Sequence, residues 1–359
     1  MKNTVTEATP KDGPAMLALI ESAASRGSIE LIYTRRPDAY WSYQQEGKSA
    51  AIGLIKDAEG QIVAQAACTL RDYWINGEKR TLGYVSGVRK RADYKGWINW
   101  KAVSDFILES RCDLFYCSFL SDNPSALGLF TKKRAFIPTL HKLCEYTTYI
   151  LNPRAIRAPK NLNGDVMEGL RFRPMTASDL PRVIAFLNRE GQAYQFAPVV
   201  EDLFKEFSGL SESDCYVLEK DGEFAAFGAL WDQTAYRQYI VTRYQGQMTF
   251  FKKFSRITEK LGYIPIPKEN VPLVFPTLTL FYAKDNQRAY YDYFLYRVAM
   301  AVRARYSMFV VGMCSGDPNR EVFEALKSIR IRSELYYVYH DEEILLSPEM
   351  PVRLECGLL

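Results

Sequence analysis

Residues 84–107, YVSGVRKRADYKGWINWKAVSDFI, decide the fold, because they combine a strand, a basic turn and the start of a helix. The helix is predicted from apolar residues at helical spacing, namely Ala102, Val103, Phe106 and Ile107. A turn that holds phosphate usually contains several glycines, which let backbone N–H groups approach the phosphate oxygens closely. This turn contains one glycine, Gly96. It is therefore either a remodelled nucleotide-binding turn or simply a basic loop.

The composition indicates a globular chain with room for two domains. The chain has 359 residues, 48% of them hydrophobic and 25% charged, so it buries substantial cores. Aromatic residues reach 14%, which favours either aromatic-lined pockets or a tyrosine-rich core. The formal net charge of +4 is too small to predict nucleic-acid binding from charge alone.

Other features of the sequence argue against membrane insertion, secretion and metal binding. No stretch approaches the run of about 18 apolar residues that a membrane helix needs, and the N-terminus lacks the apolar core of a signal peptide. The seven cysteines are scattered without a C-x-x-C motif, which fits reduced thiols in a cytoplasmic protein. With only two histidines, His141 and His340, a His-based zinc site or nucleophile pair is not expected.

The chain presents one order of predicted elements twice, on either side of a linker rich in Pro, Asn and Gly. Each half reads as strand, helix, hairpin, long strand, helix, buried strand, short helix and aromatic strand. Both first helices begin with the same spacing, Thr9 with Asp12 and Thr176 with Asp179, which is typical of an N-terminal capping box.

This repeated order predicts an α/β fold with a mixed sheet, built as two tandem domains. The predicted limits are 1–152 for the first domain, 153–169 for the linker and 170–359 for the second domain. A basic and aromatic insert at about 234–272 interrupts the second domain.

The order of elements resembles the GCN5-related N-acetyltransferase (GNAT) superfamily, present twice and covering nearly the whole chain apart from the linker and the insert. The resemblance implies that the long fourth strand and the turn after it bind acyl-CoA, with acetyl-CoA as the expected donor. Strand backbone groups would pair with the pantetheine arm, and turn N–H groups would hold the pyrophosphate. Lys95 stands at the basic position of the family turn, whereas Ile98 and Trp100 replace its two small residues.

By this resemblance the cofactor-binding residues are expected in the first half. They are Val88, Arg89, Lys90, Lys95, Gly96, Trp97, Ile98 and Asn99 in the strand and turn, with Asn123 further on. In the second half the corresponding stretch, 284–292, contains no glycine at all, so cofactor binding is less expected there.

Acyl transfer to an amine needs a base for the ammonium group, a donor for the leaving thiolate and N–H groups at the thioester oxygen. In the family the acid is often a tyrosine on the helix after the fifth strand, but this sequence has Phe130 there, so the usual acid is missing. The candidates for catalysis are Glu145, Tyr84 and Ser121. The family's acceptor-side loop corresponds to residues 32–47, so a further set of residues is expected to contact the acceptor: Arg35, Tyr40 and Trp41.

Three functions follow as hypotheses. The first is an acyl-CoA-dependent N-acyltransferase, with its active site in the first half, acting on an amine of a small molecule or peptide. The second is a catalytically impaired relative that binds CoA or another ligand as a sensor or structural partner. The third is acyl or aminoacyl transfer from another carrier, such as charged tRNA, supported only by the basic insert. The sequence does not indicate the acceptor or the oligomeric state.

Overall fold

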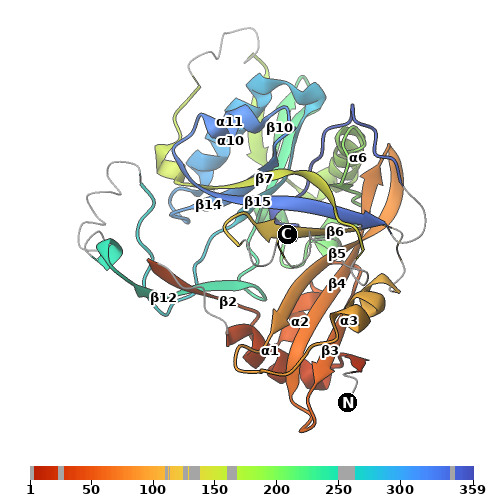
Figure 1. Cartoon of the computed structure of the whole chain (residues 1–359). Coiled ribbons are helices and arrows are strands. Elements are labelled where there is room, and N and C mark those ends of the chain that lie inside the picture. The colour runs from red at the N-terminus through yellow and green to blue at the C-terminus, as the bar shows by residue number, and fades with distance from the viewer. Residues whose placement is uncertain are drawn as a thin grey trace.

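The computed structural model describes residues 4–22, 28–109, 112, 114–123, 128, 138–159, 168–249, 263–339 and 344–359. Within these residues, a mixed sheet of 13 strands runs through the molecule (Figure 1). In spatial order the strands are β1 (Val5–Glu7), β3 (Ser49–Lys56), β4 (Ile62–Ile75), β5 (Glu78–Lys90), β6 (Leu114–Leu120), β15 (Ser328–Tyr339), β7 (His141–Leu151), β14 (Phe309–Cys314), β13 (Thr277–Ala283), β11 (Glu223–Trp231), β10 (Cys215–Lys220) and β8 (Leu170–Pro174), with β9 (Ala197–Pro198) paired to β4. The predicted mixed α/β fold is confirmed. The tandem arrangement and its domain limits stay predictions.

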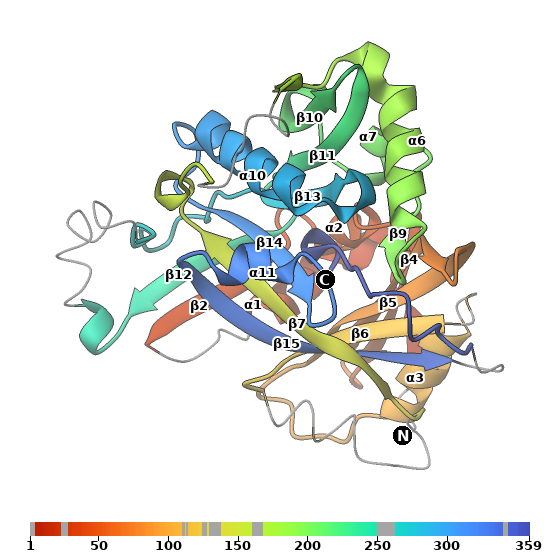
Figure 2. The same ribbon diagram turned by 90° about the horizontal axis from the view of Figure 1, so that it is seen from above.

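The two halves of the chain, residues 4–159 and 168–359, exchange their closing strands (Figure 2). The last strand of the second half, β15, pairs with β6 of the first half, for example at Tyr337 opposite Tyr116. The last strand of the first half, β7, pairs on its other side with β14 of the second half, at Tyr149 opposite Val311. Each half of the sheet is therefore completed by a strand from the other half.

Seven α-helices are described, and the first helix of each half begins at its predicted capping box. They are α1 (Gly13–Glu21), α2 (Ala39–Gln44), α3 (Trp100–Leu108), α6 (Leu180–Gly191), α7 (Leu203–Glu206), α10 (Arg288–Val302) and α11 (Arg320–Glu324). Both predicted capping boxes are confirmed: Asp12 accepts from the Thr9 N–H at 2.9 Å, and Asp179 accepts from the Thr176 N–H at 2.9 Å. In each case the box closes a short 3-10 turn that leads directly into α1 or α6.

Helices cover both faces of the first-half sheet. On one face α3 contributes Val103 and Ile107 to a cluster with residues of β3 and β4. On the opposite face α1 and α2 pack Met16 and Tyr43 against the same strands. A third cluster joins the halves, because Tyr116 of β6 lies there with Leu335 and Leu354 from the second half.

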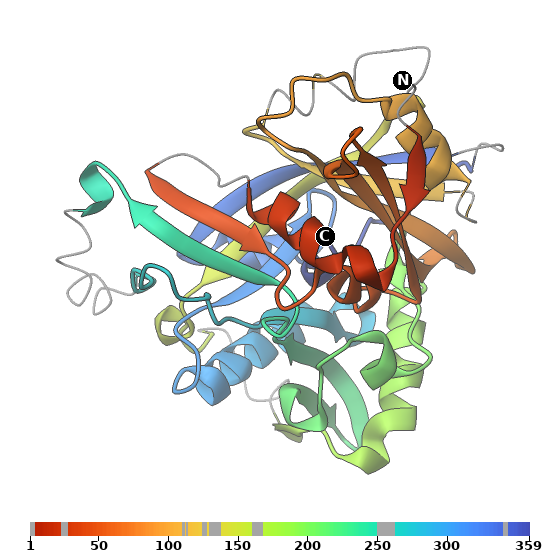
Figure 3. The same ribbon diagram turned by 90° about the horizontal axis from the view of Figure 1, so that it is seen from below.

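A separate two-stranded sheet also joins the halves and projects to one side of the molecule (Figure 3). It pairs β2 (Ile29–Thr34) antiparallel with β12 (Gln238–Tyr244), which lies in the predicted insert. This pairing brings the first part of the insert beside the acceptor-side loop predicted at 32–47, because Gln238 lies opposite Thr34.

Candidate active site

Strand β5 leaves its neighbour β6 part-way along its length. The two strands pair in parallel only from Leu82 to Val85, although β5 continues to Lys90. On its other side β5 stays paired with β4 but shifts register at Gly87, where Ser86 lies opposite Ala67 and Arg89 opposite Gln65. Gly87 has φ +62°, and a Cβ on it would lie 2.0 Å from the Tyr43 hydroxyl oxygen. The close approach of the Tyr43 hydroxyl therefore requires glycine at this bulge position.

The turn after β5 is basic, but it is built differently from a glycine-rich phosphate turn. The Ile98 side chain is buried with α3, so it faces the core, and Asn99 caps α3 by accepting from the Ala102 N–H. Trp97 is 68% exposed. Lys90 donates to the Gly96 carbonyl at 3.2 Å. Ile98 thus fills the core and takes no space from a ligand that approaches the turn.

Two cations of this turn remain available to an anion. Among the described residues, neither Arg89 nor the exposed Lys95 forms an ion pair, whereas Arg91 is held by Asp93 and Asp57. The main-chain N–H groups of Lys95 and Gly96 likewise donate to no described atom. Of the predicted residues, Val88, Arg89 and Lys90 end β5 and Lys95, Gly96 and Trp97 lie in the turn after it, whereas Ile98 is buried with α3 and Asn99 caps that helix.

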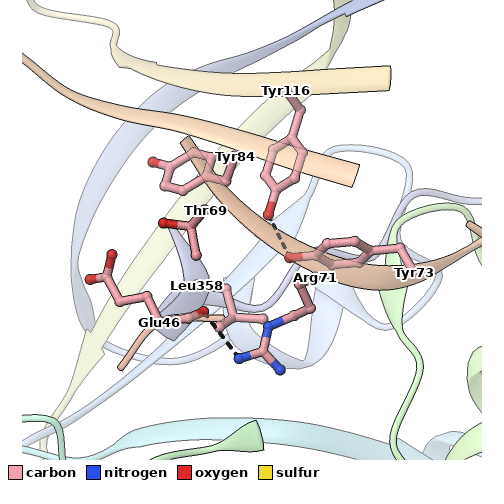
Figure 4. Close-up of a pocket in the computed structure, with 7 residues that line it drawn as sticks. All are labelled: Glu46, Thr69, Arg71, Tyr73, Tyr84, Tyr116 and Leu358. Atoms are coloured by element: carbon pink, nitrogen blue, oxygen red, sulfur yellow. Dashed lines mark hydrogen bonds between the residues drawn. The ribbon is translucent and has the colours of Figure 1, made fainter. Parts of the chain in front are cut away.

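A small buried polar pocket lies beside this opening, on the face of the sheet that Thr69 and Tyr84 share (Figure 4). Its lining residues are Glu46, Thr69, Arg71, Tyr73, Tyr84, Tyr116 and Leu358, and it has room for about one water molecule. The Tyr84 and Ser118 hydroxyls form a hydrogen bond of 2.8 Å, and the Tyr73 and Tyr116 hydroxyls form one of 2.5 Å. Burial raises the pKa of Tyr84 and of Tyr116, so both phenols stay neutral.

Glu46 is the acidic group of the pocket, and arginines from both halves surround it. Arg35 donates to Glu46 Oε2 at 3.1 Å, and Arg237 of the second half lies 3.6 Å from Oε1. Glu46 Oε1 is 2.9 Å from Arg35 Nη2 but accepts no hydrogen bond of good geometry. The Thr69 hydroxyl and Arg71 Nη1 are also buried without a hydrogen-bond partner. Such unsatisfied buried polar atoms are costly, and they favour a polar ligand or water.

The structure brings some of the predicted site residues together and separates others. Tyr84 lines the pocket, and Arg35 is buried beside it, held by Glu46 and Ser42. Tyr40 packs against the α1–α2 cluster, and Trp41, 42% exposed, lies edge-on to Tyr236.

Glu145, Ser121 and Asn123 do not join this pocket. Glu145 is exposed on β7, which β15 and β6 separate from β5, and its carboxylate lies 3.6 Å from Lys142. Ser121 and Asn123 are exposed just after β6. Phe130 falls outside the described residues.

Most of the pocket residues were not predicted as site residues, although the sequence pattern weakly indicates some of them. Thr69, Arg71 and Tyr73 are polar residues at alternate positions of β4, which places them on one face, but the predicted hairpin ended at Leu70. Glu46 belongs to the predicted acceptor-side loop, but nothing in the sequence places it under Arg237, 191 positions further along.

In the second half, the corresponding opening is filled by the chain itself. Strands β13 and β14 pair only at Thr277 opposite Val310, and residues 353–358 occupy the space between them. There Arg353 pairs with Asp317 at 2.8 and 2.9 Å, while the Leu354 carbonyl accepts from Tyr146 at 3.0 Å. The carboxylate of Glu355 accepts from the Leu280 N–H at 3.0 Å. A ligand would have to displace this segment.

No helix among the described residues is long and apolar enough to cross a membrane. No group of three or more His, Cys, Asp or Glu side chains in this part of the chain is placed to hold a metal ion.

Comparisons with known proteins agree on the fold. No protein-family model and no curated protein matches the sequence. One similar solved structure is a probable N-acyltransferase from Enterococcus faecalis, with a TM-score of 0.52, 10% identity, and coverage of 94% of this chain and 72% of that one. Another is a GCN5-related N-acetyltransferase from Anabaena variabilis, with a TM-score of 0.51, 10% identity, and coverage of 93% and 72%.

A third similar structure is the GCN5-related glucosamine N-acetyltransferase region of a fungal multi-domain GH3 β-N-acetylglucosaminidase. Its TM-score is 0.61 at 12% identity, and the match covers 94% of this chain but only 38% of that protein. At such low identities the likeness establishes the fold, which these acetyltransferases share, and function has to be argued from the site.

Proposed function

We propose that the protein is an acyl-CoA-dependent N-acyltransferase with its active site in the first half. The observation that carries this proposal is the meeting of two features at Tyr84: the opening between β5 and β6, which ends at a basic turn, and a buried polar pocket with an unsatisfied carboxylate oxygen. The fold likeness to N-acetyltransferases supports the same reaction class.

The residues of the β5–β6 opening fit an acyl-CoA. Residues 86–90 of β5 extend past the end of the β6 ladder, which leaves that edge for the pantetheine arm. Arg89 and Lys95, with the N–H groups of Lys95 and Gly96, are placed to bind the pyrophosphate. When bound, acyl-CoA supplies an activated acyl group, whose C–S bond breaks as the C–N bond to the acceptor amine forms.

The pocket residues prepare the acceptor and the leaving group. Glu46 Oε1 accepts a hydrogen bond from the amine, takes its proton and passes it to solvent. The Tyr84 phenol stays neutral because burial raises its pKa, so it donates a hydrogen bond to the leaving sulfur without releasing its proton. A thiol with an ordinary pKa of about 8.5 is a fair leaving group, so solvent protonates it afterwards.

The acceptor is proposed to be an amine of a small molecule or peptide, of which only the amino group would enter a pocket with room for about one water molecule. All seven cysteines are free thiols, which supports a reducing, cytoplasmic location. Binding of charged tRNA finds no added support: the described part of the insert pairs as β12 with β2.

Replacing Glu46 with Gln is expected to lower kcat/KM by roughly 10- to 100-fold, because the amide keeps the shape of the carboxylate but takes no proton. The measurement is thiol release from acetyl-CoA in a screen of primary amines, with far-ultraviolet circular dichroism to verify folding. Glu145→Gln is the matched control, since Glu145 is exposed on β7, and it is expected to retain full activity. Equal activity of Glu46→Gln and the parent protein would remove Glu46 from the proposed mechanism.

A second function has one specific observation in its favour. The pocket, which Leu358 helps to line, has room for only about one water molecule, so a protein that binds CoA without transferring the acyl group fits this form. Binding of acetyl-CoA with no thiol release across the whole amine screen would favour this alternative.

A further inference from the structure

The two long strands that border the openings carry the same irregularity. In β5 the register shifts between Ser86, opposite Ala67, and Arg89, opposite Gln65. In β13 it shifts between Thr279, opposite Ala229, and Tyr282, opposite Phe227. In each strand two residues lie opposite a single residue of the neighbouring strand, which defines a β-bulge. The first residue of each bulge has a positive φ, +62° at Gly87 and +51° at Leu280. By register, Ser86 therefore corresponds to Thr279 and Gly87 to Leu280.

The bulge of β13 shows what this arrangement binds. The Thr279 hydroxyl donates to Glu355 Oε2 at 2.7 Å, and the Leu280 N–H donates to the same oxygen at 3.0 Å. Glu355 is buried, and burial raises its pKa, so the oxygen is held in a site that excludes water. A side-chain hydroxyl and a bulge N–H in this geometry thus form a two-donor site for one oxygen atom.

The bulge of β5 offers the corresponding hydroxyl, that of Ser86, without a partner. The Ser86 hydroxyl is buried and forms no hydrogen bond among the described residues. Its side chain is on the same face as Tyr84, because the two residues are two positions apart in the strand. The Ser86 hydroxyl therefore lies on the face of β5 where Tyr84 lines the pocket, beside the β5–β6 opening. No residue of the described chain plays the part that Glu355 plays in the second half.

We propose that the Ser86 hydroxyl binds the oxygen of the acyl group and is a catalytic residue of the transfer. This inference rests on the proposed N-acyltransferase function. As the amine nitrogen bonds to the acyl carbon, electron density moves onto that oxygen, and it returns when the bond to sulfur breaks and the sulfur leaves with the electron pair. A fixed donor strengthens its hydrogen bond as this charge develops, so it lowers the barrier. The amine proton goes to Glu46, as above.

The comparison of the two bulges also implies a single acyl site per chain, at β5. In the second half Glu355 already fills the two-donor site, and Arg353 holds this segment through Asp317. In the first half the Ser86 hydroxyl has no such partner among the described residues, so it is left for an acyl oxygen.

The test is the Ser86→Ala variant, with Ser86→Thr as the conservative variant because threonine has this role in the second half. Ser86→Ala is expected to lower kcat/KM by roughly 100- to 1,000-fold, because it removes one donor to the developing oxyanion. Ser86→Thr is expected to retain most activity. Thr279→Val, the matched control, is expected to lower the melting temperature and leave activity unchanged.

A second readout needs no acceptor: the infrared carbonyl band of bound acetyl-CoA labelled with carbon-13 at the acetyl carbonyl. A hydrogen bond from Ser86 lowers the frequency of this band, so Ser86→Ala is expected to move it back toward the value of free acetyl-CoA. The affinity for CoA, which has no acyl oxygen, is expected to stay the same. An unchanged band with unchanged kcat/KM in Ser86→Ala would overturn the inference while leaving the proposed function intact. Failure of the parent protein to bind either CoA or acetyl-CoA would overturn the proposed function, and this inference with it.

Discussion

A fragment of residues 1–159 is expected not to fold when it is produced without the rest of the chain. In the whole protein β7 pairs with β14 and β15, and β6 pairs on its outer side with β15. The fragment would therefore contain β7 without a neighbouring strand and β6 as an exposed edge. Its part of the shared cluster, including Tyr73 and Tyr116, would also lose the packing of Leu335 and Leu354. The expected loss is essentially the whole free energy of unfolding, which is small for any domain.

The measurement is urea unfolding followed by tyrosine and tryptophan fluorescence. The fragment is expected to show no cooperative transition, whereas the full chain is expected to unfold in a single one, because the exchanged strands couple the halves. Mixing the fragment with residues 160–359 is the control, and it is expected to restore a cooperative transition. A cooperative transition of the fragment alone would instead establish 1–152 as an independent domain.

The Arg353→Met variant is expected to lower the free energy of unfolding by about 3–5 kcal/mol, since it leaves a buried carboxylate unpaired. Arg353 is 5% exposed and donates twice to Asp317, whose side chain is buried as well. It also donates to the Tyr291 hydroxyl at 2.9 Å and lies over the Tyr194 ring, 3.9 Å from its centroid. These contacts fix residues 353–358 between β13 and β14.

Urea unfolding measures this loss, and an exposed ion pair of the same residue types provides the control. Arg288 pairs with Asp292 at 3.0 Å on α10 but is 46% exposed, so Arg288→Met is expected to cost less than about 1 kcal/mol. Adding Asp317→Leu to Arg353→Met is expected to recover part of the stability, because the unpaired charge is then removed. Equal losses for Arg353→Met and Arg288→Met would contradict the structural role of this segment.

The sequence predicted the local elements well because their signals are local. The capping boxes at Thr9 and Thr176, the long strand before the basic turn and the helix after it all follow from short-range spacing. The observed strand ends at Lys90 and the helix begins at Trp100, each two residues later than predicted. The exchange of β7 and β15 could not be predicted, because both are aromatic strands and their sequences do not distinguish the two positions in the sheet.

Only part of the site was predicted, because the sequence pattern does not reveal side-chain direction or contacts between residues far apart in the chain. The turn pattern located the basic turn, but it placed Ile98 against a phosphate. In the structure the Ile98 side chain is buried with α3, because removing its apolar surface from water is favourable. Glu46 lies near Arg237, which is far away in the sequence, and Leu358 lines the pocket because the last residues of the chain fold back to it. Such contacts join residues far apart in sequence, which spacing does not reveal.

The central claim, one acyl-CoA site per chain at the turn after β5, is tested most directly by isothermal titration with acetyl-CoA. We expect one site per chain in the parent protein, and a loss of roughly tenfold in affinity, about 1.4 kcal/mol, in Lys95→Glu. Lys284→Glu, at the corresponding turn after β13, is expected to bind like the parent protein. No heat in the parent protein, two sites per chain, or unchanged affinity in Lys95→Glu would contradict the claim.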